Sequence, residues 1–594
     1  MAGGAFVGLC FIASCASKGP AFEPLRIQRG AVVCEHPIAT QVGLDILNAG
    51  GNAADAAVAV SFALAVVYPN AGNLGGGGFA LVVEEGKSPT ALDFREVAPA
   101  DTDPKFYLDA QGQLVSKRSV RGPLSVGVPG STAGMFALYK QHGSGNLVWS
   151  DLIEPARRLA AEGFGIDAHM AEDLLNPSVQ ACFNQAALDV FYPGGATLKE
   201  GELLVQKDLA KTLKAIAVQG PSAFYKGPIA TAMLQVLAKE PLPDGGAAQG
   251  GVITAKDLEG YSVRWMKPLL GSFQGMELIC MPPPSSGGLV ILQALAVLEG
   301  LPQMAEAQVG QEDEFDGFVS ENLLHWWIEA LRRAFADRAE HMGDPDFHDV
   351  PVAQLLSPEW ILERRVSIGS KADLSVGAWT PRPATESAET THLSVVDIDG
   401  GAVSMTTTLN GSYGSGIMVE GAGFLLNNEL DDFSIMAGVP NQFGLIGNEA
   451  NAIEPGKRPL SSMSPVIVRD GDGAIRLVLG SPGGPRIITA VFQVLLRVLL
   501  LEQDLPDALA ASRFHQQWRP ETTWFEGAQG PGWDPALLER LRKRGHPIEV
   551  RDSRAGSVQA ILIGPDGWPT ASSDPRRGGA GGVQGKGIAQ AARP

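Results

Sequence analysis

The stretch ETTHLSVVD, residues 389–397, is followed by IDGG, residues 398–401, and by AVSMTTTLN, residues 402–410. Both long segments are rich in Thr and Val and an Asp-Gly pair joins them, which predicts a β-hairpin. Threonines lie at the beginning of the first strand and at the end of the second. Hydroxyl groups from both strands could therefore meet at one end of the hairpin. A Pro-, Ser-, Thr- and Ala-rich stretch, residues 379–388, precedes it and indicates an exposed loop.

The abrupt start of the first strand after this loop suggests a chemical role for Thr390. If the chain is cut between Glu389 and Thr390, the Thr390 hydroxyl becomes a nucleophile whose own α-amine is the base. A free α-amine has a pKa near ~8, so much of it is unprotonated near neutrality and can take the hydroxyl proton. From the pattern alone, an ordinary Thr-rich hairpin is the commoner explanation.

Length and charge limit the classes of protein. The chain has 594 residues, of which 45% are apolar and 19% charged, and this composition can bury a core as several domains or as one large α/β unit. The net charge of −19 favours neither nucleic acid nor an anionic membrane surface as a partner. An anionic substrate would need local cations. The 72 glycines cluster in runs, as expected where the backbone approaches a ligand.

The first residues have the pattern of an export signal. Residues 5–13 (AFVGLCFIA) are too short to span a bilayer and match the apolar part of a signal peptide. They end in Ile-Ala-Ser-Cys15, which resembles a lipobox, so we expect lipidation at Cys15 and a leader at 1–15. No Lys or Arg precedes the run, and a plain signal peptide is the alternative. The five cysteines have no metal-like or CxxC spacing, and we expect buried thiols and no metal or cofactor.

Several elements follow from local patterns. Residues 42–67 predict two helices separated by a tight turn at 48–52, the second of them buried. GNLGGGGF, residues 72–79, precedes a strand, which argues against a dinucleotide fingerprint. Residues 91–96 predict a short strand that carries Arg95. Residues 322–341 predict an amphipathic helix, after which Asp344, Asp346 and His348 indicate a solvated helix end rather than a metal site.

Four loops after the hairpin carry candidate functional groups. Three acids follow an apolar strand at 425–433, and a Gly-, Pro- and Asn-rich loop at 435–458 is typical of a lid. Residues 459–465 (PLSSMSP) lead into a strand. GSPGG, residues 480–484, joins a strand to the helix predicted at 487–501, where backbone N–H groups could form an oxyanion pocket.

These motifs together resemble the gamma-glutamyltranspeptidase (glutathione hydrolase) family from about residue 30 to residue 576. The blocks that carry the resemblance are GNLGGGGF, LDFRE, MPPPSSGG, EALRRAFADRAE, TTHLSVVD, NNELDDFS, PLSSMSP, GSPGG and SRFHQQW.

The resemblance implies an α/β fold, an N-terminal-nucleophile hydrolase αββα sandwich. In this fold two stacked, mainly antiparallel sheets lie between helical layers, formed from a self-cleaved precursor. It implies a large subunit at 16–389 and a small subunit at 390–594, which form one structural unit as a heterodimer. Thr390 corresponds to the family nucleophile and Thr408 to the hydroxyl that supports it. Gly483 and Gly484 correspond to the oxyanion hole.

A γ-glutamyl group presents an α-ammonium and an α-carboxylate, so its recognition needs charges of both signs. Arg95 suits the carboxylate because its planar fork binds carboxylates through two hydrogen bonds, and Ser461 and Ser462 can add donors. Glu429 and Asp432, together with Asn410, suit the ammonium. Without the resemblance, a solvated strand end for the acids and a surface ion pair with Glu96 for Arg95 would be the simpler interpretations.

The chain departs from the family pattern in three places. Gly401 stands where the family has Asn or Ser, and the loop before Thr390 is short. Phe443 stands where many bacterial members have a lid tyrosine, whose hydroxyl the resemblance implies would bond Asn410. None of these departures removes a catalytic group.

We therefore expect a γ-glutamyltransferase or glutathione hydrolase that acts through a γ-glutamyl ester at Thr390, passed to water or to an amino acid or peptide. We expect it in the periplasm or cell envelope, and lipidation at Cys15 would anchor it to the outer membrane. The alternatives are a glutaryl- or cephalosporin-type acylase of the same fold and an envelope binding protein that has lost catalysis. The lid and the acids argue against the acylase.

Overall fold

The predicted hairpin forms the centre of the largest sheet in the computed structural model, which describes residues 26–115, 117–245, 251–301, 319–377, 390–447, 449–527 and 532–590. Strands β9 (Thr391–Val396) and β10 (Ala402–Thr408) pair antiparallel, with Thr391 opposite Thr407, which confirms the hairpin. The turn is closed by the Asp397 carboxylate, which accepts hydrogen bonds from the backbone N–H groups of Asp399 and Gly401. Gly400 has a φ of +79°, a conformation that glycine adopts without strain.

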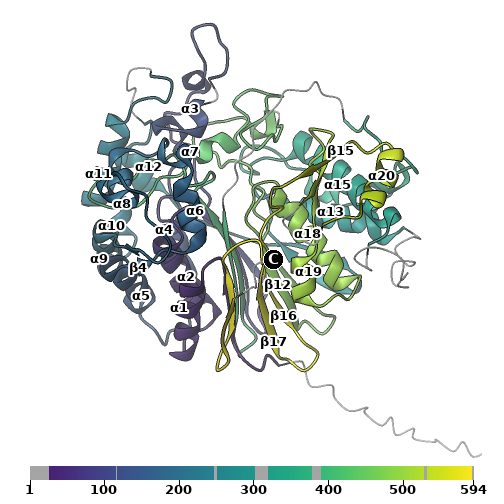
Figure 1. Cartoon of the computed structure of the whole chain (residues 1–594), viewed down its shortest axis with the longest axis horizontal. Helices are drawn as coiled ribbons and strands as arrows, with labels where there is room; N and C mark the ends of the chain where they lie inside the picture. Colours follow the sequence, from purple (N-terminus) through teal and green to yellow (C-terminus); the bar gives the residue numbers. More distant parts are fainter. Residues whose placement is uncertain are drawn as a thin grey trace, which may run out of the picture.

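Two antiparallel sheets lie face to face in the middle of the molecule (Figure 1). The eight-stranded sheet has, in order, β19 (Gly587–Gln590), β18 (Ala580–Val583), β1 (Ala31–Cys34), β9, β10, β2 (Gly77–Val83), β3 (Thr90–Asp93) and β6 (Arg264–Met266). The six-stranded sheet has, in order, β17 (Pro569–Ser573), β16 (Gln559–Ile563), β12 (Ile475–Gly480), β11 (Val466–Arg469), β8 (Met276–Cys280) and β7 (Leu269–Phe273). Both sheets thus contain strands from before and from after residue 390, and the two parts of the chain are hydrogen-bonded to each other in each sheet.

Helices cover the outer face of each sheet, so the layers run helix, sheet, sheet, helix (Figure 1). The layer on the eight-stranded sheet includes α1 (Pro37–Asn48), α2 (Ala53–Val67), α4 (Ser131–His142), α5 (Trp149–Glu162), α9 (Lys207–Gln219) and α11 (Gly227–Lys239). The layer on the six-stranded sheet includes α13 (Gly287–Glu299), α15 (Glu321–His341), α17 (Pro358–Val366), α18 (Arg486–Leu499), α19 (Leu505–Ala510) and α20 (Pro535–Lys543). A small sheet of β13 (Phe514–His515), β14 (Thr523–Glu526) and β15 (Ile548–Arg551) lies beyond them.

The two faces of the hairpin explain how these layers meet. Leu393, Val395 and Met405 belong to the core that the hairpin shares with α2, a helix whose residues are all buried. Small polar residues occupy the other face: Ser394 donates to the backbone oxygen of Gln559 in β16, and Ser404 donates to that of Leu479 in β12. These short side chains allow the second sheet to approach closely while their hydroxyls remain hydrogen-bonded.

Most local predictions agree with the structure. The two helices predicted at 42–67 are α1 and α2, and the side chain of Asn52 caps α2 by accepting a hydrogen bond from the Asp55 N–H. The helices predicted at 322–341 and 487–501 are α15 and α18. The strand predicted at 91–96 is too long, because β3 ends at Asp93. Arg95 therefore lies in the loop after the strand, where its side chain turns away from the sheet.

The glycine run at 75–78 has a different role from the one that the sequence suggests. A Cβ atom at Gly76 would lie 2.0 Å from the backbone oxygen of Thr408, and one at Gly78 would lie 2.3 Å from that of Thr406. A Cβ atom at Gly75 would lie 2.1 Å from the backbone oxygen of Leu425. The run lets β2 and the loop before it pack against β10, so its close approach is to protein backbone rather than to a ligand.

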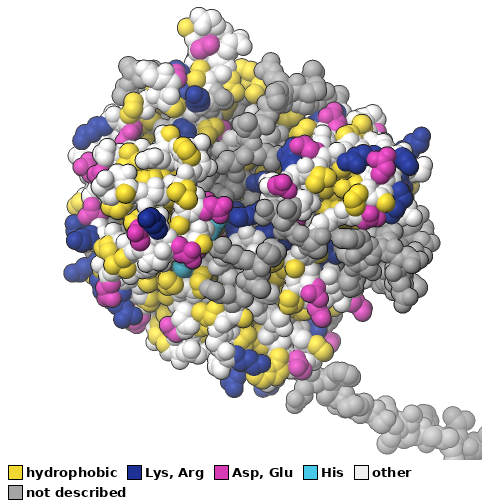
Figure 2. All heavy atoms as spheres, viewed as in Figure 1, with side chains coloured by type: hydrophobic (Ala, Val, Ile, Leu, Met, Phe, Trp, Pro, Cys, Tyr) yellow, Lys and Arg dark blue, Asp and Glu magenta, His cyan; other side chains and the backbone are white. Residues whose placement is uncertain are grey.

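Acidic and basic side chains are interspersed over the described residues on the face seen in Figure 2. Among the described residues, none of the helices combines the length and apolar composition needed to cross a bilayer.

Candidate active site

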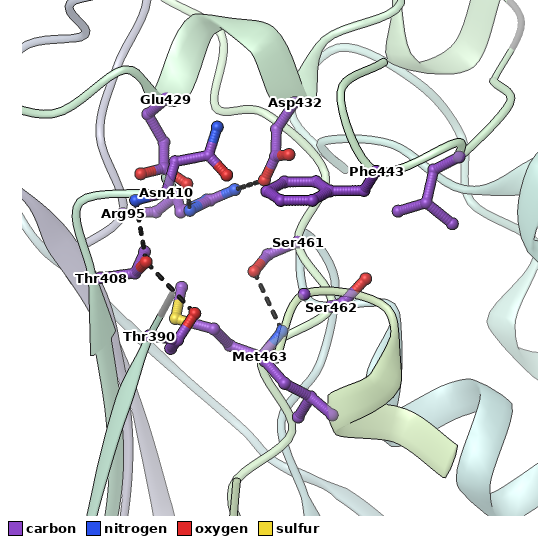
Figure 3. A pocket seen from close by; sticks show the side chains of 13 residues that line it. Arg95, Thr390, Thr408, Asn410, Glu429, Asp432, Phe443, Ser461, Ser462 and Met463 are labelled. Carbon is purple, nitrogen blue, oxygen red and sulfur yellow. Dashed lines mark hydrogen bonds and ion pairs between the residues drawn. The ribbon is translucent and has the colours of Figure 1, made fainter. Parts of the chain in front are cut away.

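Thr390 and Thr408 meet at one end of the hairpin, as the sequence predicts. Thr390 directly precedes β9 and Thr408 ends β10, and their Oγ1 atoms are 3.3 Å apart (Figure 3). The backbone N–H of Asn410 donates to Thr408 Oγ1 at 2.8 Å, and both threonines are buried. Asn73, in the glycine-rich block, donates to the backbone oxygen of Thr408 at 2.9 Å. The hairpin register and these contacts hold the two hydroxyls together.

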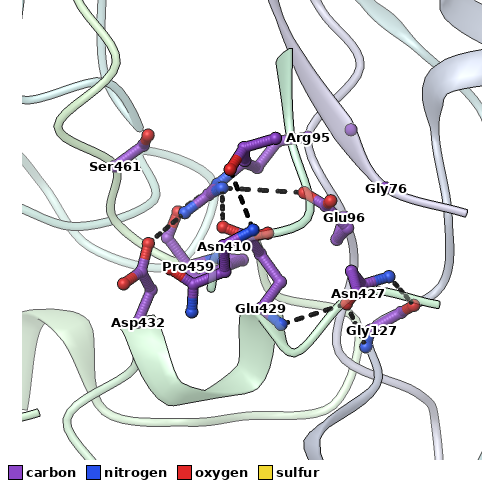
Figure 4. A network of polar contacts seen from close by, with 12 residues as sticks. Gly76, Arg95, Glu96, Gly127, Asn410, Asn427, Glu429, Asp432, Pro459 and Ser461 are labelled. Carbon is purple, nitrogen blue, oxygen red and sulfur yellow. Dashed lines mark hydrogen bonds and ion pairs between the residues drawn. The ribbon is translucent and has the colours of Figure 1, made fainter. Parts of the chain in front are cut away.

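Arg95 forms the centre of a buried group of charges at the same pocket, which we call the pocket cluster: Arg95, Glu96, Glu429 and Asp432. The guanidinium contacts Glu429 through Nη1 and Asp432 Oδ2 through Nη2, the latter at 2.6 Å (Figure 4). Arg95 Nη1 also lies 3.6 Å from Glu96 Oε2. Both Arg95 and Glu96 are 0% exposed, so the alternative of a surface ion pair between them is wrong.

The pocket cluster contains one cation and three acids, and burial raises the pKa values of the acids. Burial raises the pKa of Glu96 to about 7, against the effect of Arg95. Burial also raises the pKa of Glu429 well above its ordinary value and raises that of Asp432, and in both cases Arg95 only partly opposes the rise. Both oxygens of Glu96, and Oε2 of Glu429, accept no hydrogen bond from any described residue. The cluster therefore has acceptor oxygens left for a cationic ligand, and a bound cation would favour the ionised forms of its acids.

A neighbouring asparagine positions the loop that carries the acids. Asn427 donates through Nδ2 to the backbone oxygens of Gly75 and Gly127 and accepts from the N–H groups of Gly127 and Glu429 (Figure 4). These four bonds connect the end of the predicted apolar strand to the start of the short helical turn Glu429–Asp432. A buried amide with every group satisfied is rigid, so Glu429 begins from a fixed backbone position.

Serine hydroxyls form another wall of the pocket. The Ser461 hydroxyl accepts a hydrogen bond from the backbone N–H of Met463 at 3.1 Å (Figure 3). The Ser461 carbonyl accepts from both the N–H and the hydroxyl of Ser286. The buried Ser462 hydroxyl has no hydrogen-bond partner among the described residues. Ser462 can therefore donate to an acceptor that enters the pocket.

The strand–helix junction at Gly483 and Gly484 lies beside the threonines. Gly483 has a φ of +128° and Gly484 a φ of +57°, and Gly484 lines the pocket. Neither backbone N–H group donates a hydrogen bond to a described residue. Two such N–H groups next to a hydroxyl nucleophile could stabilise the negative oxygen of a tetrahedral intermediate.

The loop at 435–458, of which residue 448 is not described, covers the pocket. Phe443 is 3% exposed, and its ring points into the pocket beside Asp432 and Arg95 (Figure 3). Asn441 shapes the loop tip, because its Oδ1 accepts from the N–H groups of Phe443 and Leu445, while its Nδ2 donates to Asp432 Oδ1 at 3.3 Å. Asn410 donates through Nδ2 to the backbone oxygen of Asn428. The loop is thus linked directly to an acid of the pocket cluster.

The pocket brings together nearly all the residues that the sequence nominated. Its walls contain Arg95, Thr390, Thr408, Asn410, Glu429, Asp432, Phe443, Ser461, Ser462 and Gly484. Gly483 precedes Gly484 but is not itself part of the wall. The apolar wall residues Leu445, Met463 and Ile487 were not foreseen, since nothing distinguishes them from core residues in the sequence. Cys15 and Glu389 lie outside the described residues.

Within the described ranges, no group of three or more His, Cys, Asp or Glu side chains could hold a metal ion. Asp344 pairs with Arg264 at 2.8 Å and accepts from the Arg458 N–H, and Asp346 also pairs with Arg264. Asp344 is therefore a buried structural acid, so the predicted solvated helix end describes Asp346, which is exposed, and His348, which is half-buried, but not Asp344.

Comparison with known proteins gives concordant matches along the chain. A family model described as Gamma-glutamyltranspeptidase matches residues 39–583. The glutathione hydrolase proenzyme of Escherichia coli (strain K12) is 41% identical over 584 residues, which cover 96% of this chain and 96% of that protein.

Solved structures agree with this result. A gamma-glutamyltranspeptidase structure from Helicobacter pylori is 39% identical with a TM-score of 0.50, covering 59% of this chain and 92% of that chain. A cephalosporin acylase from Bacillus halodurans is 28% identical with a TM-score of 0.78, covering 97% of this chain and 99% of that chain.

Proposed function

This chain belongs to the gamma-glutamyltranspeptidase family and cleaves the γ-glutamyl amide of glutathione and related compounds, and we propose that Thr390 is its nucleophile. The proposal extends to the fold class, an N-terminal-nucleophile hydrolase whose precursor cuts itself between Glu389 and Thr390. The word proenzyme in the name of the E. coli relative supports such a cut. The carrying observation is the 3.3 Å contact between the Thr390 and Thr408 hydroxyls in a pocket that also holds Arg95 and acids.

The proposed chemistry begins at the Thr390 hydroxyl. Thr390 Oγ1 forms a bond to the γ-carbonyl carbon, and the freed α-amine of Thr390 takes the hydroxyl proton. The C–N bond then breaks, the departing amine receives that proton, and a γ-glutamyl ester remains on Oγ1. Water attacks the ester to release glutamate, or an amino acid or peptide amine attacks it to form a new amide. Thr408, with one lone pair already bonded by the Asn410 N–H, can orient Thr390 through its own hydroxyl.

We assign the oxyanion to the backbone N–H groups of Gly483 and Gly484. Both lack a hydrogen-bond acceptor among the described residues, and Gly484 lines the pocket next to Thr390. A donor of this kind is worth about 2.7–4 kcal/mol of transition-state stabilisation.

The charges at the other end of the pocket suit the α-carbon of a γ-glutamyl group. Arg95 is assigned to the α-carboxylate, with Ser461 and Ser462 as further donors. Glu429 and Asp432, with Asn410, are assigned to the α-ammonium. Arg95 pairs with Glu429 and Asp432, so opposite charges lie side by side, and a zwitterionic substrate can take the place of a partner on each side.

The rival assignment is an acylase that removes a glutaryl group, and the cephalosporin acylase structure at a TM-score of 0.78 favours it. A glutaryl group has the carboxylate but no ammonium, so it would bind Arg95 and leave the acceptor oxygens of Glu429 and Asp432 without the cationic group that they suit. A buried acceptor left unpaired in this way costs about 1–3 kcal/mol. The acids and the higher identity to the glutathione hydrolase both favour the γ-glutamyl substrate.

Two measurements test this proposal. On a denaturing gel, the purified protein should give fragments near ~41 kDa (less any removed leader) and ~21 kDa, and Thr390→Ala should stay as one chain because the hydroxyl is the attacking group. Mature enzyme should hydrolyse a γ-glutamyl anilide and not a glutaryl anilide. Two fragments from Thr390→Ala would show that another residue cuts the chain, and preference for the glutaryl compound would establish the acylase.

We also propose that the chain is exported and that Cys15 carries a lipid. Support comes from the Ile-Ala-Ser-Cys15 pattern after a short apolar run. In cell fractionation the wild type should remain with membranes and Cys15→Ala should be released. A wild type found wholly in the soluble fraction would instead indicate a cleaved signal peptide.

A further inference from the structure

A second cavity lies beneath the loop that covers the active site, and it contains a buried arginine without a counter-ion. Arg338 on α15 is 4% exposed, and its Nε donates to the Ser286 hydroxyl at 2.8 Å. Its two Nη groups donate no hydrogen bond, and the guanidinium forms no ion pair, with any described residue. The cavity wall also contains Asp432, Asn441 and Asn451. The four Nη N–H groups can therefore serve a partner at this cavity.

Asp432 is the acid that the two cavities share. It lines both the active-site pocket and the cavity of Arg338. Its Oδ2 contacts Arg95 at 2.6 Å, and its Oδ1 accepts from Asn441 of the covering loop. Burial lowers the pKa of Arg338 to about 10, and Asp432 is the charge that opposes this fall. Asp432 is therefore the acid placed to interact with both arginines.

Substrate binding requires that one acid leave Arg95, because carboxylates already occupy both Nη atoms of its guanidinium fork. Its Nε donates to the backbone oxygen of Pro459 and its Nη2 to that of Leu460, both at 3.3 Å, while Glu429 and Asp432 take the remaining fork. An α-carboxylate can therefore bind Arg95 through two hydrogen bonds only after displacing a carboxylate. Glu429 is 0% exposed and has no second cation, whereas Asp432 faces Arg338.

We propose that Arg338 is a positioning residue for donor binding, because it becomes the counter-ion of Asp432 when the substrate α-carboxylate displaces Asp432 from Arg95. Asp432 then stays ionised and presents its other oxygen to the substrate α-ammonium. This inference rests on the proposed function and assigns a role in the same reaction to a residue outside the pocket wall. Arg338 also fixes its own position through Ser286, which donates to the Ser461 carbonyl.

The charges that face Asp432 determine its titration. Arg95 and Arg338 favour its ionised form, and so does a hydrogen bond with the Glu429 side chain. The other acids near it are Glu96 and Asp431, and Asp432 raises the pKa of both. Burial raises the pKa of Asp432, and both arginines act against the rise. Since Asp432 must be ionised to bind the ammonium, loss of Arg338 should move the acid limb of donor binding to higher pH.

The test uses mature enzyme and L-glutamate as a competitive inhibitor, whose inhibition constant reports binding without chemistry. Arg338→Gln should weaken L-glutamate binding about tenfold at neutral pH, about 1.4 kcal/mol, and raise the donor KM with kcat within about threefold. The pH below which L-glutamate binding weakens should rise by about one unit. Arg338→Lys should restore most of both effects. The control is Arg364→Gln, which removes a half-buried arginine of α17 that pairs with Asp337 of α15. It should change neither the inhibition constant nor its pH dependence.

A double-mutant cycle separates positioning from general structural support. In an Asp432→Asn background, Arg338→Gln should cause no further loss of L-glutamate binding, because its partner carries no charge. An equal loss in both backgrounds, or an unchanged inhibition constant and pH limb in Arg338→Gln, would overturn the inference. A wild type that does not hydrolyse a γ-glutamyl anilide would instead count against the proposed function.

A crystal structure of wild-type enzyme with L-glutamate decides the question even if Arg338→Gln fails to fold. The inference requires an Asp432 carboxylate oxygen within about 4 Å of an Arg338 nitrogen. An Asp432 that remains on Arg95 in that complex would refute it.

Discussion

Two buried arginine–carboxylate clusters in this molecule differ in their charge balance. The scaffold cluster, in the C-terminal part, contains Arg513, Glu526, Asp574 and Arg576. Arg576 binds Glu526 through two hydrogen bonds at 2.8 and 2.6 Å, and Arg513 contacts Asp574 at 2.6 Å. Two cations face two acids, and although burial opposes it, Arg513 and Arg576 lower the pKa of Asp574. The pocket cluster instead has one cation for three acids, with raised pKa values.

This difference separates a structural role from a binding role. In the scaffold cluster, backbone N–H groups satisfy the carboxylates further: Arg513 and Ala555 donate to Glu526, and Val558 and Arg576 donate to Asp574. Every carboxylate oxygen of the scaffold cluster therefore already has a partner within the protein. The pocket cluster has carboxylate oxygens without partners and an excess of negative charge. A folded protein tolerates that excess where a cationic group of the substrate completes it.

The largest expected effect is on stability, in the scaffold cluster. Arg576→Met leaves Glu526 and Asp574 buried without their shared cation, which should cost about 3–5 kcal/mol of unfolding free energy. Denaturant unfolding measures the loss. The surface variant Arg542→Met, which removes an exposed pair with Glu539, should cost less than about 0.5 kcal/mol. Similar losses for both variants would show that the scaffold cluster contributes no more than a surface pair.

The second effect is on binding, in the pocket cluster. Arg95→Ala should leave self-cleavage intact but weaken binding of γ-glutamyl donors by about 2–4 kcal/mol, because the substrate carboxylate loses its charged partner. Its stability should fall less than that of Arg576→Met, since acids with raised pKa values can take up protons instead. Comparison of kcat/KM in Arg95→Ala and in the control Arg264→Ala checks this, and an unchanged ratio for Arg95→Ala would exclude the role.

The third effect is the pH dependence of the unfolding free energy. Acids of the two clusters should change it in opposite directions as the pH rises. The pKa of Glu96 rises on folding from 4.5 to about 7, so the folded state binds the proton more tightly and loses stability as pH rises through this interval. Glu96→Gln should therefore stabilise the protein by about 1–3 kcal/mol above neutral pH and have less effect below about pH 5.

Asp574 of the scaffold cluster should show the opposite pH dependence of stability to Glu96. Its pKa falls on folding below 3.8, so its contribution is present above that pH and is lost as pH falls through the folded-state pKa. Asp574→Asn should destabilise the protein at neutral pH. Thermal unfolding of both variants across pH tests the pair, and destabilisation of equal size and pH dependence in both would contradict the contrast.

The smallest effect concerns the covering loop. Phe443 provides a ring but no hydroxyl, and the Asn410 side chain donates only to the Asn428 carbonyl, so its Oδ1 can accept a new bond. A neutral hydrogen bond contributes about 0.5–1.5 kcal/mol, so Phe443→Tyr should tighten donor binding by a factor of roughly 2–13 with little change in self-cleavage. The KM for a γ-glutamyl anilide measures it. An unchanged KM would mean that ring packing alone closes the loop.

Local pattern accounts for the elements that the sequence predicts well. The Thr/Val alternation and the Asp-Gly turn predict β9 and β10, and the apolar spacing at 42–67 predicts α1 and α2, because these signals depend on neighbours a few residues apart. The same reasoning failed at Arg95, where Phe94 directly after Asp93 resembles a continuing strand. It also failed at Glu96, since nothing local distinguishes a buried acid from one on the surface.

The sequence by itself determined the hairpin, the pairing of two threonines at its end and, through the resemblance, the residue types that surround a γ-glutamyl group. Only the tertiary structure decided that Arg95 and Glu429, 334 residues apart, form a buried contact. Only the tertiary structure shows that Arg338 faces the same acid from a second cavity. The physical reason is that helices and strands follow the spacing of apolar residues along a short stretch of sequence. Charge state and ion pairing depend instead on burial, which arises when distant segments pack together.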